Sequence, residues 1–224
     1  METPHRKLPT HELVYRKIRE RILFGELQPG QAVTIQGLVA ELGAGMTPVR
    51  EAIRRLTAEG ALEFLGNRRA CVPELTEEQL EELSFARLAI EPRLSQIATG
   101  KMTAADIDKL TDIDNALNEA IDAGDVRGYL QHNYRFHATL YRLSDAKILI
   151  AMANALWLRV GPSLRVVCGQ IGTYNLPDKH EEALAAMRAG DADAVADAIA
   201  EDLRQGHEQI RLSFARNADL IKSG

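Results

Sequence analysis

An arginine-rich stretch near residue 50 carries side chains suited to contact with a nucleic acid. Arg50 and Arg54 lie four residues apart, so in a helix they share one face, with Arg55 beside them. The apolar residues of the same stretch fall together at helical spacing: Val49, Ala52, Ile53 and Leu56. Guanidinium groups bond to guanine edges and phosphates, so the pattern predicts a helix that presents arginines to a DNA major groove. A lone helix of this kind is more often just a solvated surface, so its neighbours decide the interpretation.

Imidazole and carboxylate groups in the second half of the chain are the other candidates for chemistry. Asn133 and His137 are four residues apart and project together from one predicted helix. His180 and Asp202 fall in two later predicted helices, and spacing alone does not bring these helices together. A single helical histidine is more often a satisfied polar residue than a metal ligand, so both alternatives stay open.

The elements around the arginines predict a helix-turn-helix. Three helices are expected, at 11–24, 34–42 and 47–59. Thr34 and Thr47 are the expected N-caps, and Pro48 suits the first helical position. Gly43-Ala44-Gly45 forms the tight turn before the arginine helix, and Gly60 ends that helix.

A short β-hairpin is expected after the third helix. Residues 61–65 and 69–72 have strand character, and Gly66-Asn67-Arg68 separates them as a turn. A hairpin in this place makes a winged helix. Its wing would hold Arg68 and Arg69 near the DNA backbone or the minor groove.

The rest of the chain predicts an all-α antiparallel bundle. Thr76 with Gln79, and Thr103 with Asp106, form capping boxes that open two of its helices. Six helices are expected, at 76–99, 103–124, 125–143, 144–167, 177–190 and 191–215, with a loop at 169–176. Short connections between long amphipathic helices are typical of a bundle, so the whole chain is expected to be mainly α.

Composition and charge are consistent with two different parts. Residues 1–72 carry three more basic than acidic side chains, whereas the remainder carries eight more acidic than basic ones. A basic segment on an acidic body fits a nucleic-acid module joined to another domain. No apolar run approaches the ~20 residues of a membrane span, and the N-terminus lacks a signal-peptide layout. Cys71 and Cys168 are expected to be free thiols in a reducing cytoplasm.

The N-terminal part resembles the winged helix-turn-helix domain of the GntR family of bacterial transcription regulators, here over residues 8–73. The matching runs are 22–30, Leu42-Gly43, Thr47-Pro48-Val49-Arg50-Glu51-Ala52, Leu56 and Glu59-Gly60. The resemblance implies DNA contacts by Gln36, Thr47, Arg50, Arg54, Arg68 and Arg69. The chain departs from the family in having Gly45-Met46 where Ser-Arg is usual and Arg69 where glycine is usual. These departures imply an operator sequence that differs from the one usual in the family.

Residues 76–216 resemble the FCD domain, the all-helical effector-binding domain of FadR-type GntR regulators. The supporting runs are Arg87-Leu88-Ala89-Ile90-Glu91, Asn133-Tyr134-Arg135-Phe136-His137, His180-Glu181-Glu182-Ala183-Leu184 and Gly190-Asp191. The resemblance implies a divalent metal, zinc, nickel or manganese, bound by Asn133, His137, His180 and Asp202. Two of these, Asn133 and Asp202, replace the usual aspartate and third histidine. It also implies that Arg87 binds a small carboxylate effector, the alternative being an intrahelical ion pair with Glu91.

The resemblance implies a cytoplasmic, homodimeric transcription regulator, most often a repressor, that binds a palindromic operator. A small organic acid in the bundle, touching the metal or Arg87, would change DNA affinity through a hinge near Pro73–Thr76. Trp157, Tyr134 and Phe136 are expected to belong to the core.

Two other functions remain open on the sequence. One is a metal-dependent hydrolase, with His137, His180 and Asp202 on the metal and Glu181 as the base. The other is a ligand sensor of weak DNA affinity, in which Gly45 and Met46 have removed base recognition.

Overall fold

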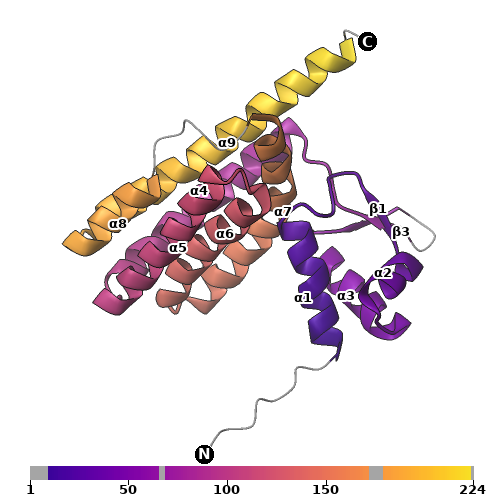
Figure 1. Cartoon of the computed structure of the whole chain (residues 1–224), viewed down its shortest axis with the longest axis horizontal. Coiled ribbons are helices and arrows are strands. Elements are labelled where there is room, and N and C mark those ends of the chain that lie inside the picture. The colour runs from indigo at the N-terminus through magenta and orange to yellow at the C-terminus, as the bar shows by residue number, and fades with distance from the viewer. Residues whose placement is uncertain (1–9, 66–68, 172–178, 223–224) are drawn as a thin grey trace, which may run out of the picture.

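The chain folds into two helical parts in a computed structural model that describes residues 10–65, 69–171 and 179–222. The N-terminal part, here called the head, comprises the elements from α1 to β3, and the bundle comprises α4 to α9. Figure 1 shows the head to one side of the bundle, with α1 next to α7. The predicted fold class, mainly α with a winged helix-turn-helix and a helical bundle, is confirmed.

The three helices of the head are α1 (Thr10–Leu23), α2 (Ile35–Leu42) and α3 (Met46–Ala58). As predicted, Thr34 caps α2 by accepting a hydrogen bond from the Gly37 N–H, and Gly43 ends that helix in the left-handed conformation at φ 59°. The expected N-cap of α3, Thr47, is wrong by two residues. Gly45 is its N-cap and Thr47 already lies inside the helix. Pro48 still fits, because N–H groups of the first turn have no acceptor within the helix.

A small antiparallel sheet completes the head. Its strands are β1 (Ala32–Thr34), β2 (Glu63–Phe64) and β3 (Arg69–Cys71), in the order β1-β3-β2. The β2–β3 hairpin was predicted, whereas β1 was not, because its three residues run directly into the cap of α2. The expected turn at 66–68, with Arg68, lies outside the described residues.

The bundle contains the six predicted helices. They are α4 (Glu77–Thr99), α5 (Ala104–Asp122), α6 (Val126–Leu143), α7 (Lys147–Ile171), α8 (Lys179–Ala189) and α9 (Ala192–Lys222). Both capping boxes form as predicted, at Thr76 with Gln79 and at Thr103 with Asp106.

Three predicted boundaries in the bundle are wrong. The helix α7 begins at Lys147 and not at the expected cap Ser144-Asp145, because Ser144 is the C-cap of α6. The helix α7 continues through Gly169 to Ile171, where a loop was expected, because one interior glycine costs a helix only about 1 kcal/mol. The rest of that expected loop, and the expected start of α8 at Pro177-Asp178, lie outside the described residues. The last helix continues beyond Ala215 to Lys222, since no glycine or proline interrupts that stretch.

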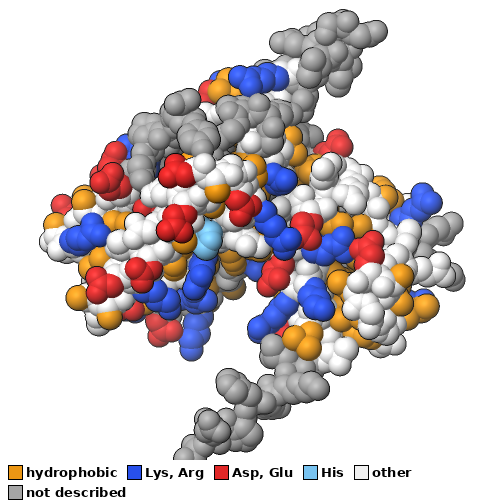
Figure 2. Space-filling model, in the orientation of Figure 1, with side chains coloured by type: hydrophobic (Ala, Val, Ile, Leu, Met, Phe, Trp, Pro, Cys, Tyr) orange, Lys and Arg blue, Asp and Glu red, His pale blue; other side chains and the backbone are white. Residues whose placement is uncertain are grey.

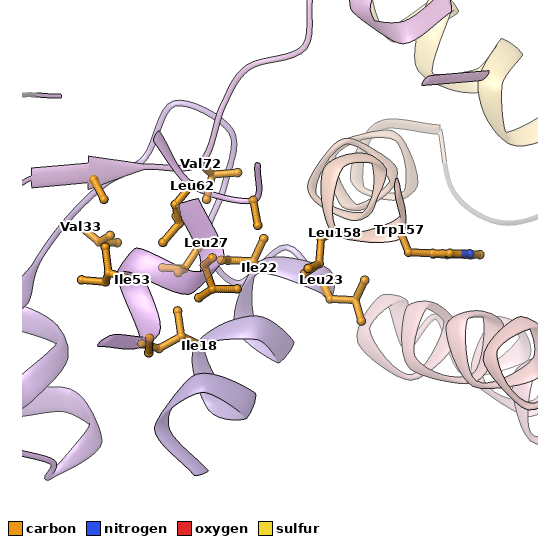
Figure 3. Close-up of a cluster of buried hydrophobic side chains, with 14 of the residues drawn as sticks. Ile18, Ile22, Leu23, Leu27, Val33, Ile53, Leu62, Val72, Trp157 and Leu158 are labelled. Atoms are coloured by element: carbon orange, nitrogen blue, oxygen red, sulfur yellow. The ribbon is translucent and has the colours of Figure 1, made fainter. Parts of the chain in front are cut away.

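The hydrophobic core of the head extends into the bundle. In the space-filling view the two parts meet above a notch at the lower centre (Figure 2). One cluster of buried side chains includes Ile18, Ile22 and Leu23 of α1 together with Trp157 and Leu158 of α7. Figure 3 shows Leu158 next to Leu23, while Trp157 points away from the head. A second cluster lies wholly within the bundle, around Phe136 and Leu140.

The helix backbones also touch at this junction. A Cβ atom on Gly161 of α7 would lie 2.4 Å from the carbonyl oxygen of Leu23. Only glycine permits this approach, so the end of α1 rests directly on the backbone of α7.

The two cysteines, Cys71 and Cys168, are free, as expected, and both are buried. None of the helices in the described ranges is both long enough and apolar enough to cross a membrane.

Candidate nucleic-acid interface and metal centre

The outer face of α3 carries the predicted arginines. Val49, Ala52, Ile53 and Leu56 are buried, which confirms the predicted apolar side. Thr47, Arg50 and Arg54 are exposed. Arg54 donates to Glu51 at 2.7 Å, but with 76% of the arginine side chain exposed the pair contributes little and can open. No carboxylate pairs with Arg50 among the described residues.

Two further predicted contacts are also at the surface of the head. Gln36 is exposed on α2, the helix before α3, and Arg69 is exposed where β3 begins. The head therefore presents polar and basic side chains from its second helix, its third helix and its hairpin.

Arg55 does not share the face of Arg50 and Arg54. Its guanidinium bonds to Glu12 at 3.0 Å and Glu59 at 3.1 Å, and its Cζ lies 3.6 Å from the centroid of the Tyr15 ring. These contacts turn Arg55 toward α1. The expectation that it stands beside the other two arginines is therefore wrong, because its neighbours on α1 supply an acid and an aromatic ring.

Three of the four predicted metal ligands come together inside the bundle. Ligand atoms of His137 on α6, His180 on α8 and Asp202 on α9 all lie within 4.8 Å of one another. The Nε2 atoms of the two histidines are 3.3 Å apart, and Nε2 of His137 lies 3.1 Å from Oδ2 of Asp202. Asn133 is half-buried on α6, one helical turn before His137.

Neighbouring side chains hold both imidazoles with Nε2 directed toward the centre of this cluster. Nδ1 of His180 lies 2.9 Å from Oδ1 of Asp114, and Nδ1 of His137 lies 3.0 Å from the hydroxyl of Tyr141. The Phe136 ring stacks on His180 at 3.9 Å between centroids. Such contacts fix the ring orientation and the tautomer of a metal-binding histidine.

Asp114 is a site residue that the sequence interpretation missed. It is buried on α5 between Ile113 and Leu117, which are also buried. A carboxylate within an apolar helical stripe was the available signal, because a buried charge requires a partner.

The protonation states of the cluster favour a cation. Burial lowers the pKa of His137, and the hydrogen bond to Asp202 offsets this only in part. Burial alone would raise the pKa of Asp202, but the hydrogen bond to His137, together with the positive charge of Arg87, lowers it to about 2. Metals bind neutral imidazole and ionised carboxylate, the forms that these shifts favour.

The spacing of the donor atoms fits a first-row divalent metal. Bonds of ~2.1 Å place neighbouring ligand atoms ~3.0–3.4 Å apart in tetrahedral or octahedral geometry. The 3.3 Å and 3.1 Å separations fall in this range, whereas His180 Nε2 and Asp202 Oδ1 are 4.0 Å apart. Two imidazoles and a carboxylate are a suitable set for zinc, nickel or manganese.

Arg87 forms the buried ion pair that was the alternative to effector binding. Its Nε donates to Glu91 at 2.5 Å and its Nη2 at 3.2 Å, and its Cζ lies 4.5 Å from the Trp157 ring centroid. Glu91 also accepts from Tyr141 at 2.6 Å and from the Trp157 indole at 3.0 Å. A cavity of about 10 Å³ beside Arg87 has room for about one water molecule.

The aromatic residues expected in the core are there. Trp157 and Phe136 are buried, and Tyr134 packs against the buried cluster. Trp157 and Phe136 also contact the polar groups just described.

Comparison with known proteins agrees with both parts. Residues 10–72 match the family described as bacterial regulatory proteins, gntR family. Residues 82–205, more than half of the chain, match the FCD domain.

The chain is a GntR-family transcription regulator.

Relatives of this GntR-family regulator cover almost its whole length. It is 30% identical over 195 residues to the HTH-type transcriptional regulator McbR of Escherichia coli (strain K12), covering 86% of this chain and 88% of McbR. It is 23% identical over 215 residues to the HTH-type transcriptional repressor RspR of the same organism, covering 94% and 93%. The solved structure of E. coli McbR/YncC has a TM-score of 0.87 and 27% identity, covering 93% of this chain and 100% of that one.

These similarities decide between a transcription regulator and the metal-dependent hydrolase. The matching families and relatives are DNA-binding transcription regulators rather than enzymes. The hydrolase alternative, with Glu181 as its base, finds no support among them.

Proposed function

We propose that this GntR-family regulator binds operator DNA through α3 and the wing, and that a small carboxylate in the bundle controls its affinity. The observation that carries the proposal is the exposed face of α3, on which Arg50 has no acidic partner among the described residues and Arg54 has only an exposed one. Gln36, Thr47, Arg54 and Arg69, with Arg68 in the wing, would support Arg50 by contacts to phosphates and base edges.

The direct test is DNA binding by fluorescence anisotropy, with a labelled fragment of the protein's own promoter. Arg50→Ala and Arg54→Ala are each expected to weaken binding by about 1–3 kcal/mol. Arg204→Ala is the matched control, because Arg204 forms an exposed pair with Glu201 at the same i,i+3 spacing as Arg54 with Glu51. Unchanged binding by Arg50→Ala would contradict the assignment of α3 as the reading helix.

We infer a domain boundary at the segment between residues 73 and 76, with a DNA-binding domain over 8–73 and an effector domain over 76–216. The protein would act in the cytoplasm as a homodimeric repressor, with half-sites about one turn of DNA apart. Light scattering measures the oligomeric state, and a reporter gene distinguishes repression from activation.

A divalent metal would be held by His137, His180 and Asp202, with Asn133 able to add a neutral oxygen ligand. When bound, the metal would supply a positive charge for an effector carboxylate, and the Arg87 guanidinium would bind that carboxylate while it remains paired with Glu91. The proposal rests on the donor spacing and on the contacts of Asp114 and Tyr141 that orient the two imidazoles.

Zinc, nickel and manganese can be tested separately on chelator-treated protein by melting temperature. A metal that binds the native state raises the melting temperature. His137→Ala should abolish the rise, whereas His207→Ala should retain it, because His207 bonds to Glu81 and lies outside the cluster. Small carboxylates are then screened with and without the metal.

A further inference from the structure

A cleft of about 760 Å³ lies between the head and the bundle, on the side of α1 and α3 that faces α6 and α7. This volume is in the range of small-molecule sites, which often lie at domain interfaces. In Figure 2 a notch separates the two parts, with Lys and Arg side chains on both of its rims. None of His137, His180 and Asp202 lines the cleft.

The cleft carries more basic than acidic side chains, and two of its four arginines have no acidic partner among the described residues. Its three acidic residues are Glu12, Glu20 and Glu59. The side chain of Glu20 is exposed to solvent and has no ion pair with an arginine of the cleft in the described part of the chain. Glu12 and Glu59 are bonded to the other two arginines, Arg16 and Arg55.

The remaining arginines, Arg19 from the head and Arg142 from the bundle, donate hydrogen bonds only to hydroxyl groups within the described ranges. Arg19 donates to Tyr134 at 3.0 Å and Arg142 donates to Thr139 at 2.9 Å. Their guanidinium groups can therefore bind an anion without first giving up an ion pair.

The other walls of the cleft are apolar. Ala138 and the ring of Tyr141 come from one face of α6, and Ile150, Ala155 and Leu158 come from one face of α7. Tyr134, whose hydroxyl also bonds to Asn154 at 3.2 Å, adds an aromatic surface beside Arg19. Arginines from both sides and an apolar floor are suited to an organic anion with a hydrophobic body.

We propose that this cleft is a second ligand site, which binds a small organic monoanion between Arg19 of the head and Arg142 of the bundle. The anion would bridge the two parts and fix their relative orientation. Tyr141 places the cleft next to the metal centre, because its hydroxyl contacts both Glu91 and Nδ1 of His137. The site is independent of the proposed effector site, and its test requires no DNA.

The test uses the full chain with benzoate as the probe and benzamide as its neutral analogue, at constant ionic strength. Benzoate at 10 mM is expected to raise the melting temperature of the wild type by about 3 °C, and benzamide is expected to have no effect. Arg19→Gln and Arg142→Gln should each remove most of this rise, and Arg19→Lys should retain part of it.

The matched control is Arg188→Gln, because Arg188 is an exposed arginine that donates to a threonine, Thr111, at 3.0 Å, away from the cleft. It should show the full rise, and so should Asp202→Asn. The proposal is overturned if benzoate has no effect, if benzamide acts equally, or if Arg142→Gln, which alters an exposed side chain, retains the full rise. It is also overturned if Asp202→Asn abolishes the rise, since the probe would then act at the metal centre.

Discussion

The arginines of this regulator show how a side chain's partners determine its role. Arg50 and Arg54 are exposed on α3, Arg55 is held by Glu12, Glu59 and the Tyr15 ring, and Arg87 is buried against Glu91. Spacing along a helix predicted the common face of Arg50 and Arg54. It could not predict that α1 turns Arg55 away, because Glu12 lies 43 residues earlier in the chain.

The contact between Asp114 and His180 gives a prediction for metal affinity. Asp114→Asn keeps every proposed ligand but removes the negative charge that orients and polarises the imidazole. Metal affinity should fall about 10- to 100-fold, measured by competition with a fluorescent chelator. Asp112→Asn changes an exposed neighbour on α5 and should have no effect. Equal affinities of the two variants would contradict the role assigned to Asp114.

The two cysteines should react slowly in the native protein. Burial raises the pKa of each thiol to about 11, and at Cys71 the hydrogen bond to Glu63 adds to the effect. At pH 8 the thiolate fraction is then about a thousandth, compared with about a quarter for an ordinary thiol. We expect labelling by Ellman's reagent to be at least about 100-fold slower than in guanidinium chloride. Rapid labelling of the folded protein would show that these side chains open to solvent.

At the scale of elements, local signals predicted most of the fold. Threonine caps, capping boxes and glycine stops placed α2, α4 and α5 correctly because each acts within one turn of helix. The strand β1 was missed because its three residues become a strand only by pairing with β3. In the candidate site, resemblance supplied His137, His180 and Asp202. Asp114 was missed because its partner, His180, lies 66 residues away.

The close approach of α1 to α7 gives a prediction for stability. Gly161→Ala would place a methyl group against the Leu23 carbonyl, which is backbone and cannot move aside easily. We expect a decrease of about 1–3 kcal/mol in the free energy of unfolding, measured by urea denaturation. Gly206→Ala is the control. Its added methyl would meet only Leu164 at 3.8 Å, so it should be neutral or slightly stabilising. A Gly161→Ala variant as stable as the wild type would mean that the two helices are not in close contact in solution.

At the scale of the whole molecule, the sequence predicted two parts and a hinge, and the structure adds a shared core. Leu23 and Leu158 belong to one buried cluster although they are far apart in the sequence. No periodicity within either helix could indicate that contact, because each apolar face is equally consistent with packing inside its own part.

The asymmetric charge of the molecule predicts salt-dependent DNA binding. The acidic body repels DNA, so attraction must come from the basic head. The logarithm of the binding constant should fall linearly with the logarithm of salt concentration, and Arg54→Gln should make this slope shallower by about 0.9 if Arg54 neutralises one phosphate. Arg211→Gln is the control, because Arg211 pairs with Glu208 on α9, outside the head. It should leave the slope unchanged. A slope that is the same for both variants would exclude Arg54 from the residues that bind phosphate.

The seam between Leu23 and Gly161 also limits how freely this protein could exchange parts with its relatives. A head taken from a relative would bring its own α1. The end of that helix would have to fit against the backbone of α7 at Gly161, where no side chain separates the two helices. Hybrid regulators should therefore fold well only when the head and α7 come from the same protein. Recombination at residues 73–76 alone would join a head from one protein to a bundle from another, so that α1 and α7 would not be complementary.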